Sequence, residues 1–232
     1  MKDKVVVITG GFGALGRAVA EVASKRGASV AALDVGQTPP AGLAERLGPK
    51  ALLLGGADLS TPDGAGKAMA EVKVKYGRLD ALINIAGGFR WAKVEDGDAA
   101  TWDLLLAINL KTALNASRAA LPYLLESGAG RIINVGAMSA LKAAAGMGPY
   151  AASKSAVHRL TESLAEELKA KNVTVNAVLP SIIDTPANRA DMPKADFSRW
   201  VAPADLAAVI LFLASDEARA VTGALIPVAG GV

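Results

Sequence analysis

The stretch VVVITGGFGALG, residues 5–16, decides the fold. Its first half, Val5–Thr9, is apolar and β-branched, which predicts a strand covered on both faces. Its second half places glycines at positions 11, 13 and 16 at the start of a segment with helical periodicity. Such glycines allow a tight turn, and the amides and dipole of the following helix N-terminus can hold a pyrophosphate. An ordinary strand–helix turn is the alternative interpretation, and the surrounding sequence decides between the two.

An acidic residue ends the next predicted strand. Asp34 follows Ala31-Ala32-Leu33, at about the distance from the glycines that dinucleotide-binding units show. A carboxylate here can accept the adenosine-ribose hydroxyls and repels a 2′-phosphate. We therefore expect NAD(H) in preference to NADP(H), and a simple strand-end turn residue is the alternative. Asp58 and Leu59, after the third strand, suit the adenine ring.

Short β-branched runs alternate with longer helical segments along the whole chain. This alternation implies right-handed crossovers and a parallel sheet. We predict an α/β fold of Rossmann type, with a doubly wound, parallel, seven-stranded sheet in a three-layer sandwich. The expected strands are Val5–Thr9, Ser29–Leu33, Ala51–Leu54, Ala81–Asn84, Arg131–Val135, Val173–Leu179 and Leu225–Val228. The expected helices are Leu15–Arg26, Ala41–Leu47, Gly64–Tyr76, Ala99–Glu126, Tyr150–Ala170 and Pro203–Ala214.

The 232 residues are predicted to form a single dinucleotide-binding domain, because no linker, repeat or low-complexity tract divides residues 1–232. One stretch is irregular: Ser181–Trp200, which contains Pro186 and Pro193. It is too long for an ordinary connection, so we expect a substrate lid at about residues 181–200.

Composition excludes several kinds of chemistry. The chain has no cysteine and one histidine, which rules out disulfides, thiolate metal sites, a cysteine nucleophile and any site that needs two histidines. Its 25 basic and 22 acidic residues are interleaved, without the basic stripe of a nucleic-acid-binding surface. The longest apolar run, Leu206–Ala214, is about half a membrane span. We expect a cytoplasmic protein with a small-molecule substrate and no metal, nucleic-acid or membrane partner.

Tyr150 and Lys154 stand one helical turn apart in the segment YAASK. On one face of a helix, a fixed ammonium stabilises a phenolate and lowers the pKa of the phenol toward the range useful for acid–base chemistry. An ordinary surface pair has the same spacing. The agreement of the rest of the chain favours a catalytic pair.

Together these motifs resemble the short-chain dehydrogenase/reductases over essentially the whole chain. The matching pieces are Thr9–Gly16, Asp58, Asn84–Gly87, Asn109, Tyr150 with Lys154, Asn176–Thr185, and the segment from Val221–Gly223 to Gly230–Gly231. The resemblance implies that Tyr150 delivers a proton, that Lys154 tunes it and holds the nicotinamide ribose, that Asn109 anchors a water relay, and that the segment ending at Thr185 holds the carboxamide. The expected cofactor contacts are Gly10, Gly11, Phe12, Gly13, Ala14, Leu15, Asp34, Asp58, Leu59, Asn84, Ala86, Gly87, Tyr150, Lys154, Pro180, Ile183 and Thr185.

Two positions depart from the family pattern. Ala14 replaces a glycine of the phosphate-binding turn, although Gly13 beside it can keep the turn open. The family's catalytic serine stands thirteen residues before the tyrosine, and that position is Ala137 here. A developing oxyanion therefore loses a donor, for which Ser139 and water are the candidate replacements.

Both departures also resemble one branch of the family, the quinonoid dihydropteridine reductases, as do the segments Ala86–Phe89, Gly136–Tyr150 and Asp184–Trp200. This resemblance implies that NADH reduces a conjugated imine of a pterin, a reaction that depends less on a serine donor. Four aromatic residues fall in segments expected around the nicotinamide, where we expect them to stack on a flat substrate. They are Phe89, Trp91, Phe197 and Trp200. Packing of the lid is the alternative role.

We therefore expect an NADH-dependent reductase of a planar, quinonoid or pterin-like substrate, with Tyr150 as proton donor. The alternatives are an NAD(P)-dependent dehydrogenase or reductase of an alcohol, ketone or 3-oxoacyl thioester, and an NAD(H) sensor without turnover. The alanine-rich helices Ala99–Glu126 and Tyr150–Ala170 are the surface expected to form a homodimer or homotetramer. The single histidine, His158, is expected to be structural or at a subunit contact.

Overall fold

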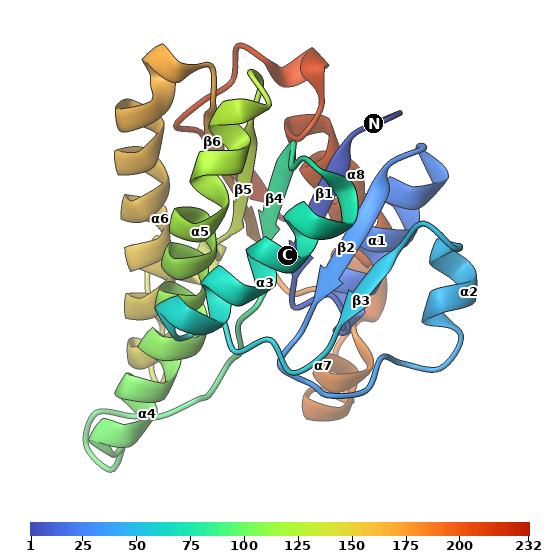
Figure 1. Cartoon of the computed structure of the whole chain (residues 1–232). Helices are drawn as coiled ribbons and strands as arrows, with labels where there is room; N and C mark the ends of the chain where they lie inside the picture. The colour runs from blue at the N-terminus through green and yellow to red at the C-terminus, as the bar shows by residue number, and fades with distance from the viewer.

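The strand Val5–Thr9 lies inside a sheet of seven parallel strands, in the order β3-β2-β1-β4-β5-β6-β7 (Figure 1). The computed structural model describes residues 1–232. Its strands are β1 Val5–Thr9, β2 Ser29–Leu33, β3 Leu52–Leu54, β4 Ala81–Asn84, β5 Arg131–Val135, β6 Thr174–Pro180 and β7 Leu225–Val228. The chain runs outward from β1 to β3 and then returns to place β4 on the other side of β1. The predicted fold class is confirmed.

Helices cover both faces of the sheet. They are α1 Ala14–Lys25, α2 Leu43–Leu47, α3 Pro62–Tyr76, α4 Ala99–Leu105, α5 Thr112–Glu126, α6 Gly148–Leu168, α7 Pro186–Asp191 and α8 Pro203–Leu213. Figure 1 shows α3, α5 and α6 on one side of the sheet and α1 and α8 on the other. No helix has both the length and the apolar character needed to cross a membrane.

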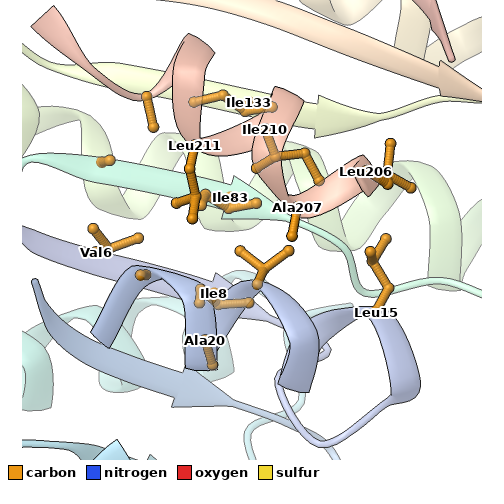
Figure 2. Close-up of a cluster of buried hydrophobic side chains, with 14 of the residues drawn as sticks. Val6, Ile8, Leu15, Ala20, Ile83, Ile133, Leu206, Ala207, Ile210 and Leu211 are labelled. Carbon is orange, nitrogen blue, oxygen red and sulfur yellow. The ribbon is translucent and has the colours of Figure 1, made fainter. Parts of the chain in front are cut away.

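Alternate residues of each strand face the two helical layers. Val6 and Ile8 of β1 pack with the residues of α1 and α8, whereas Val5 and Val7 pack with α3, α5 and α6. Figure 2 shows the first of these two cores, in which Ile210 and others from α8 lie over the central strands. Because both faces are buried, the strands are mostly apolar, which is why the sequence predicted them well.

Two segments differ from the sequence-based expectation. The helix expected at Ala99–Glu126 is interrupted by a π-helical segment, Leu106–Lys111, between α4 and α5. The expected lid at Ser181–Trp200 contains the short helix α7 and a 3₁₀ turn, Phe197–Arg199. In Figure 1, α4 and α7 lie at the same end of the molecule, below the strands.

Candidate functional site

The glycine-rich turn between β1 and α1 leaves no room for side chains at three positions. Gly10 has a φ of +65°, and a Cβ there would lie 2.9 Å from the backbone of Ala86. A Cβ on Gly11 would lie 2.7 Å from the Cβ of Ala32, and one on Gly16 would overlap the Gly10 carbonyl oxygen. The turn is therefore held between β2, the loop after β4 and its own helix. Packing alone requires these glycines.

The N-terminus of α1 lies at the carboxyl end of β1. Gly13 is the N-cap of this helix, so no side chain caps the first amides. The first turn of the helix contains no acidic residue. The first amides of a helix have no partner within the helix, and they bind anions readily. Here these amides belong to Ala14 and Leu15, two of the expected cofactor contacts.

Asp34 joins the end of β2 to the glycine-rich turn. Its Oδ2 accepts a 3.0 Å hydrogen bond from the Phe12 amide, and its Oδ1 accepts a 2.9 Å bond from the Gly36 amide. Each carboxylate oxygen keeps a further lone pair, so the side chain can still accept ribose hydroxyls. A simple strand-end turn residue explains the bond to Gly36 but not the bond to Phe12.

Asp58 and Leu59, expected beside the adenine, differ in accessibility. Asp58 is exposed, and its Oδ1 accepts bonds of 2.9 and 2.6 Å from the amide and hydroxyl of Ser60. Leu59 is buried in the core, and Asn115 of α5 donates to its carbonyl at 3.2 Å. The carboxylate of Asp58 is therefore accessible, whereas the Leu59 side chain is not.

Tyr150 and Lys154 come from the first two turns of α6. Lys154 is buried, and its Nζ donates a 2.7 Å hydrogen bond to the carbonyl of Val135, the last residue of β5. A Cβ on Gly87, after β4, would lie 3.5 Å from the same Nζ. The ends of β4 and β5 and the start of α6 therefore meet around the ammonium of Lys154.

Burial shifts the pKa of both side chains. It raises the pKa of Tyr150 to about 12, because the phenolate would lose its hydration. It lowers the pKa of Lys154 to about 8, because the ammonium is the form that loses hydration there. The direction set by burial is opposite to the lowered pKa that the spacing to Lys154 predicts for Tyr150, and the effect of Lys154 on this phenol stays a prediction. At neutral pH, Tyr150 is a phenol that can donate a proton.

Asn109 lies in the π-helical segment. Its Oδ1 accepts a 2.9 Å bond from the Gly88 amide, and its Nδ2 donates to the Gly88 carbonyl at 3.1 Å and to the Ser153 hydroxyl at 2.9 Å. Both amide hydrogens are engaged, so this side chain has no donor left for the water relay that the resemblance implies. It instead ties the loop after β4 to α6. The π segment, a form common at functional sites, was missed because apolar periodicity does not reveal it.

Asn84 ends β4 inside the molecule. Its Nδ2 donates to Asn134 at 2.9 Å and to Ser117 at 3.1 Å, while Asn134 donates to Thr161 at 2.8 Å. Its Oδ1 is buried without a partner. The Asn84 side chain therefore connects β4 with β5 and α5. The sequence placed Asn84 among the cofactor contacts, but its side chain is occupied by these bonds.

Ala137 follows β5 at the position of the family's serine. It is buried, and its amide donates a 3.3 Å hydrogen bond to Nε2 of His158 on α6. Ser139 lies in the next 3₁₀ turn, Met138–Ala140, and is half-buried. The structure brings Tyr150, Lys154 and Asn109 together around α6, whereas no hydrogen bond connects Ser139 to them.

Phe89 and Trp91 lie in the loop between β4 and α4, with 51% and 57% of their surfaces exposed. The Phe89 ring meets the Tyr150 ring edge to face, with centroids 5.0 Å apart and planes at 82°. Trp91 covers Gly146, just before α6, where an added Cβ would overlap the indole. Both aromatics therefore lie close to the start of α6 and keep a surface exposed to solvent.

The two aromatic residues of the expected lid pack against each other. The rings of Phe197 and Trp200 have centroids 4.8 Å apart, and the Arg189 guanidinium lies 4.7 Å from the Phe197 centroid. Trp200 is only 7% exposed. This burial favours the packing role for Trp200 over stacking on a substrate.

The remaining expected cofactor contacts follow β6. Pro180 is the last residue of β6, Ile183 pairs with Val201, and Thr185 caps α7 by accepting a 3.2 Å bond from the Asn188 amide. The Asn188 side chain donates to the Ile183 carbonyl at 2.7 Å. The start of the segment expected to be a lid is therefore a hydrogen-bonded turn.

All these pieces gather at the carboxyl ends of the strands. The chain changes direction between β1 and β4, and in α/β sheets such a switch point is where ligands bind. The site combines a helix N-terminus suited to an anion, the Asp34 carboxylate, a buried ammonium and a protonated phenol. It can hold a dinucleotide and donate a proton beside it.

Comparison with known proteins identifies relatives along the whole chain. A family model described as short chain dehydrogenase matches residues 4–196. The 2-(S)-hydroxypropyl-CoM dehydrogenase 3 of Xanthobacter autotrophicus is 34% identical, with 100% of this chain and 97% of that protein covered. A 3-oxoacyl-acyl-carrier-protein reductase of Thermotoga maritima is 32% identical, with 100% and 98% covered. The structure of carveol dehydrogenase from Mycobacterium avium in complex with NAD is similar with a TM-score of 0.89 at 27% identity, covering 100% and 98%.

Proposed function

The chain belongs to the short-chain dehydrogenase family, and on that premise we propose that it is an oxidoreductase that uses NAD(H) to interconvert an alcohol and a ketone. The observation that carries the proposal is the position of Tyr150 and Lys154, one turn apart at the start of α6, where the buried Lys154 ammonium is bonded to the end of β5. The names of the relatives, two dehydrogenases and a 3-oxoacyl reductase, support this reaction class better than a pterin substrate.

The residues of the site fit a dinucleotide. The amides at the start of α1 suit its phosphates, and Asp34 suits the ribose hydroxyls of NAD(H) while repelling the extra phosphate of NADP(H). Lys154 gives one of its three hydrogens to Val135, which leaves two for the hydroxyls of a second ribose. When bound, the nicotinamide supplies or accepts the hydride.

Tyr150 supplies the proton in the reducing direction. Burial raises its pKa to about 12, so the phenol carries its proton at physiological pH. A carbonyl oxygen that gains negative charge beside the phenol takes this proton. The phenolate left behind is stabilised by the positive charge of Lys154. In the oxidising direction Tyr150 must first lose its proton, so alkaline pH favours alcohol oxidation.

A second candidate is the reduction of a planar quinonoid compound, such as a quinonoid dihydropterin, by NADH. Ala137 favours it, because the residue provides no hydroxyl for a carbonyl oxygen. The exposed rings of Phe89 and Trp91 near Tyr150 also favour a flat substrate. A sensor that binds NAD(H) without turnover is a weaker alternative, because Tyr150 and Lys154 are both present.

We also propose that the protein forms a homodimer or homotetramer through α5 and α6. Several of their alanines are buried in the core, but Ala119, Ala152 and Ala156 are not, and these small side chains allow a second copy to approach closely. Sedimentation of the purified protein tests this, and a monomer at micromolar concentration would contradict it.

Steady-state oxidation of NADH separates the candidate functions. The purified protein is offered ketones, 3-oxoacyl thioesters and a quinonoid dihydropterin, each with NADH or NADPH. We expect turnover of a ketone or 3-oxoacyl thioester, faster with NADH. Turnover of the quinonoid compound alone supports the second candidate. Tight NADH binding without turnover of any compound supports the sensor.

A further inference from the structure

His158 is a buried titratable group that the proton transfer described above does not use. It is the only histidine of the chain and lies on α6, one turn beyond Lys154. Its Nε2 accepts a 3.3 Å hydrogen bond from the amide of Ala137. A ring nitrogen that accepts a hydrogen bond carries no proton, so the geometry requires a neutral imidazole with its proton on Nδ1.

Gly136 fits closely against the same ring. A Cβ added to Gly136 would overlap Nε2 and Cδ2 of His158. The Gly136 amide donates a 2.9 Å hydrogen bond to the carbonyl of Val178 on β6. Residues 136 and 137 are therefore fixed by β6 on one side and by the imidazole on the other.

The segment held in this way includes the acceptor for Lys154. Val135, Gly136 and Ala137 are consecutive, and the carbonyl of Val135 accepts the 2.7 Å bond from the Lys154 ammonium. Lys154 and His158, one turn apart on α6, thus bind the main chain of Val135 and Ala137 at the end of β5. A shift of residues 136–137 would move the carbonyl that holds Lys154.

We propose that His158 is a positioning residue, whose neutral imidazole fixes residues 135–137 so that Val135 holds the Lys154 ammonium near Tyr150. This role rests on the proposed function, because it serves that proton transfer. Burial lowers the pKa of His158 to about 4, and the charges of Arg159 and Lys154 act in the same direction. Protonation would remove the acceptor for Ala137 and add a cation close to Lys154.

The state of the imidazole can be measured without a substrate. Because the chain has one histidine, the histidine signals in a ¹⁵N NMR spectrum come from His158 alone. We expect a neutral ring protonated on Nδ1, with no titration between about pH 8 and pH 5.5, whereas an unperturbed histidine titrates near pH 6.5. A ring protonated on Nε2, or an imidazolium at pH 7, overturns the proposal whatever the protein catalyses.

Two matched variants test the role in catalysis. His158→Gln keeps an uncharged acceptor at a similar reach, and His158→Leu keeps most of the volume without an acceptor. We expect kcat of the Leu variant to fall about tenfold with KM nearly unchanged, because a misplaced Lys154 affects the chemical step. We expect the Gln variant to retain most of the wild-type kcat and its pH profile.

Two outcomes would overturn this role: equal losses in both variants, or wild-type kcat in the Leu variant. Should His158→Leu fail to fold, Gly136→Ala displaces the same ring and replaces it in the comparison with His158→Gln. A wild-type protein without turnover on any substrate contradicts the proposed function instead, and the NMR measurement then still decides whether the imidazole binds residue 137.

Discussion

The two ends of the proposed ligand site are built differently. At the dinucleotide end, the turn from Gly10 to Gly16 is enclosed by its neighbours, and Asp34 is bonded to the amides of Phe12 and Gly36. At the substrate end, Trp91 is exposed, and the rings of Phe197 and Trp200 pack against each other. An enclosed region restricts which residues it accepts, whereas an exposed region does not. The sequence pattern therefore points to a cofactor but does not identify a substrate.

Lys154→Met should produce the largest effect, because Lys154 stands where the two ends meet. Loss of the ammonium is expected to lower turnover by about a hundredfold or more. The same variant should be more stable near pH 7. The pKa of Lys154 is lowered to about 8 in the fold, below its ordinary value of 10.5, so the stability present above pH 10.5 is lost as the pH falls toward 8.

Methionine removes this cost of burying a charge. We therefore expect the free energy of unfolding to rise by about 2 kcal/mol at pH 7. Thermal unfolding at pH 7 and at pH 10.5 measures the gain, which should shrink at the higher pH. A variant less stable than the wild type at pH 7 would show that the bond from Lys154 to Val135 outweighs the burial of its charge.

Gly16→Ala tests how tightly the dinucleotide end is enclosed. Its Cβ would overlap the carbonyl oxygen of Gly10, so we expect a loss of about 2–3 kcal/mol in the free energy of unfolding, with weaker NADH binding. Gly66→Ala is the matched control, since a Cβ on this α3 residue meets nothing within 4 Å. The control should be neutral or stabilising by about 0.5–1 kcal/mol. Equal effects at both positions would refute the enclosed turn.

Ala137→Ser distinguishes the two candidate reactions at the substrate end. A hydroxyl at this position can donate to a carbonyl oxygen as negative charge develops on it. For a ketone substrate we expect kcat to rise about tenfold, and for a quinonoid substrate we expect no gain. The comparison is made with NADH at saturation. An unchanged rate on every ketone would count against an alcohol–ketone reaction.

Trp91→Ala should have the smallest effect. An exposed indole that contacts the substrate contributes about 1 kcal/mol to binding, so KM should rise about fivefold while kcat and the melting temperature stay close to the wild type. Phe212→Ala, on the exposed surface of α8, is the control and should leave KM unchanged. The same KM in both variants would remove Trp91 from the substrate site.

Residue pattern predicted the parts of the molecule that are buried and periodic. The fold class, the strand β1 and the helix that carries Tyr150 and Lys154 follow from apolar runs and helical spacing. The π segment around Asn109 does not, because it changes the backbone without changing the apolar pattern. The burial of Trp200 and the polar contacts of Asn84 depend on neighbours distant in the sequence, so spacing alone could not reveal them.

The pKa of Tyr150 shows the same limit. The spacing to Lys154 indicated a lowered pKa, yet the direction depends on burial, which sequence does not measure. The cofactor preference inferred from Asp34 and the substrate class stay predictions.

The measurement that tests the central claim most directly is the turnover of Tyr150→Phe. This change removes one oxygen and keeps the ring that Phe89 contacts, so the fold and the affinity for NADH should stay close to those of the wild type. We predict that the rate of NADH-dependent ketone reduction falls by about a thousandfold, because the proton donor is lost. A rate within about twofold of the wild type would contradict the role of Tyr150 and with it the proposed mechanism.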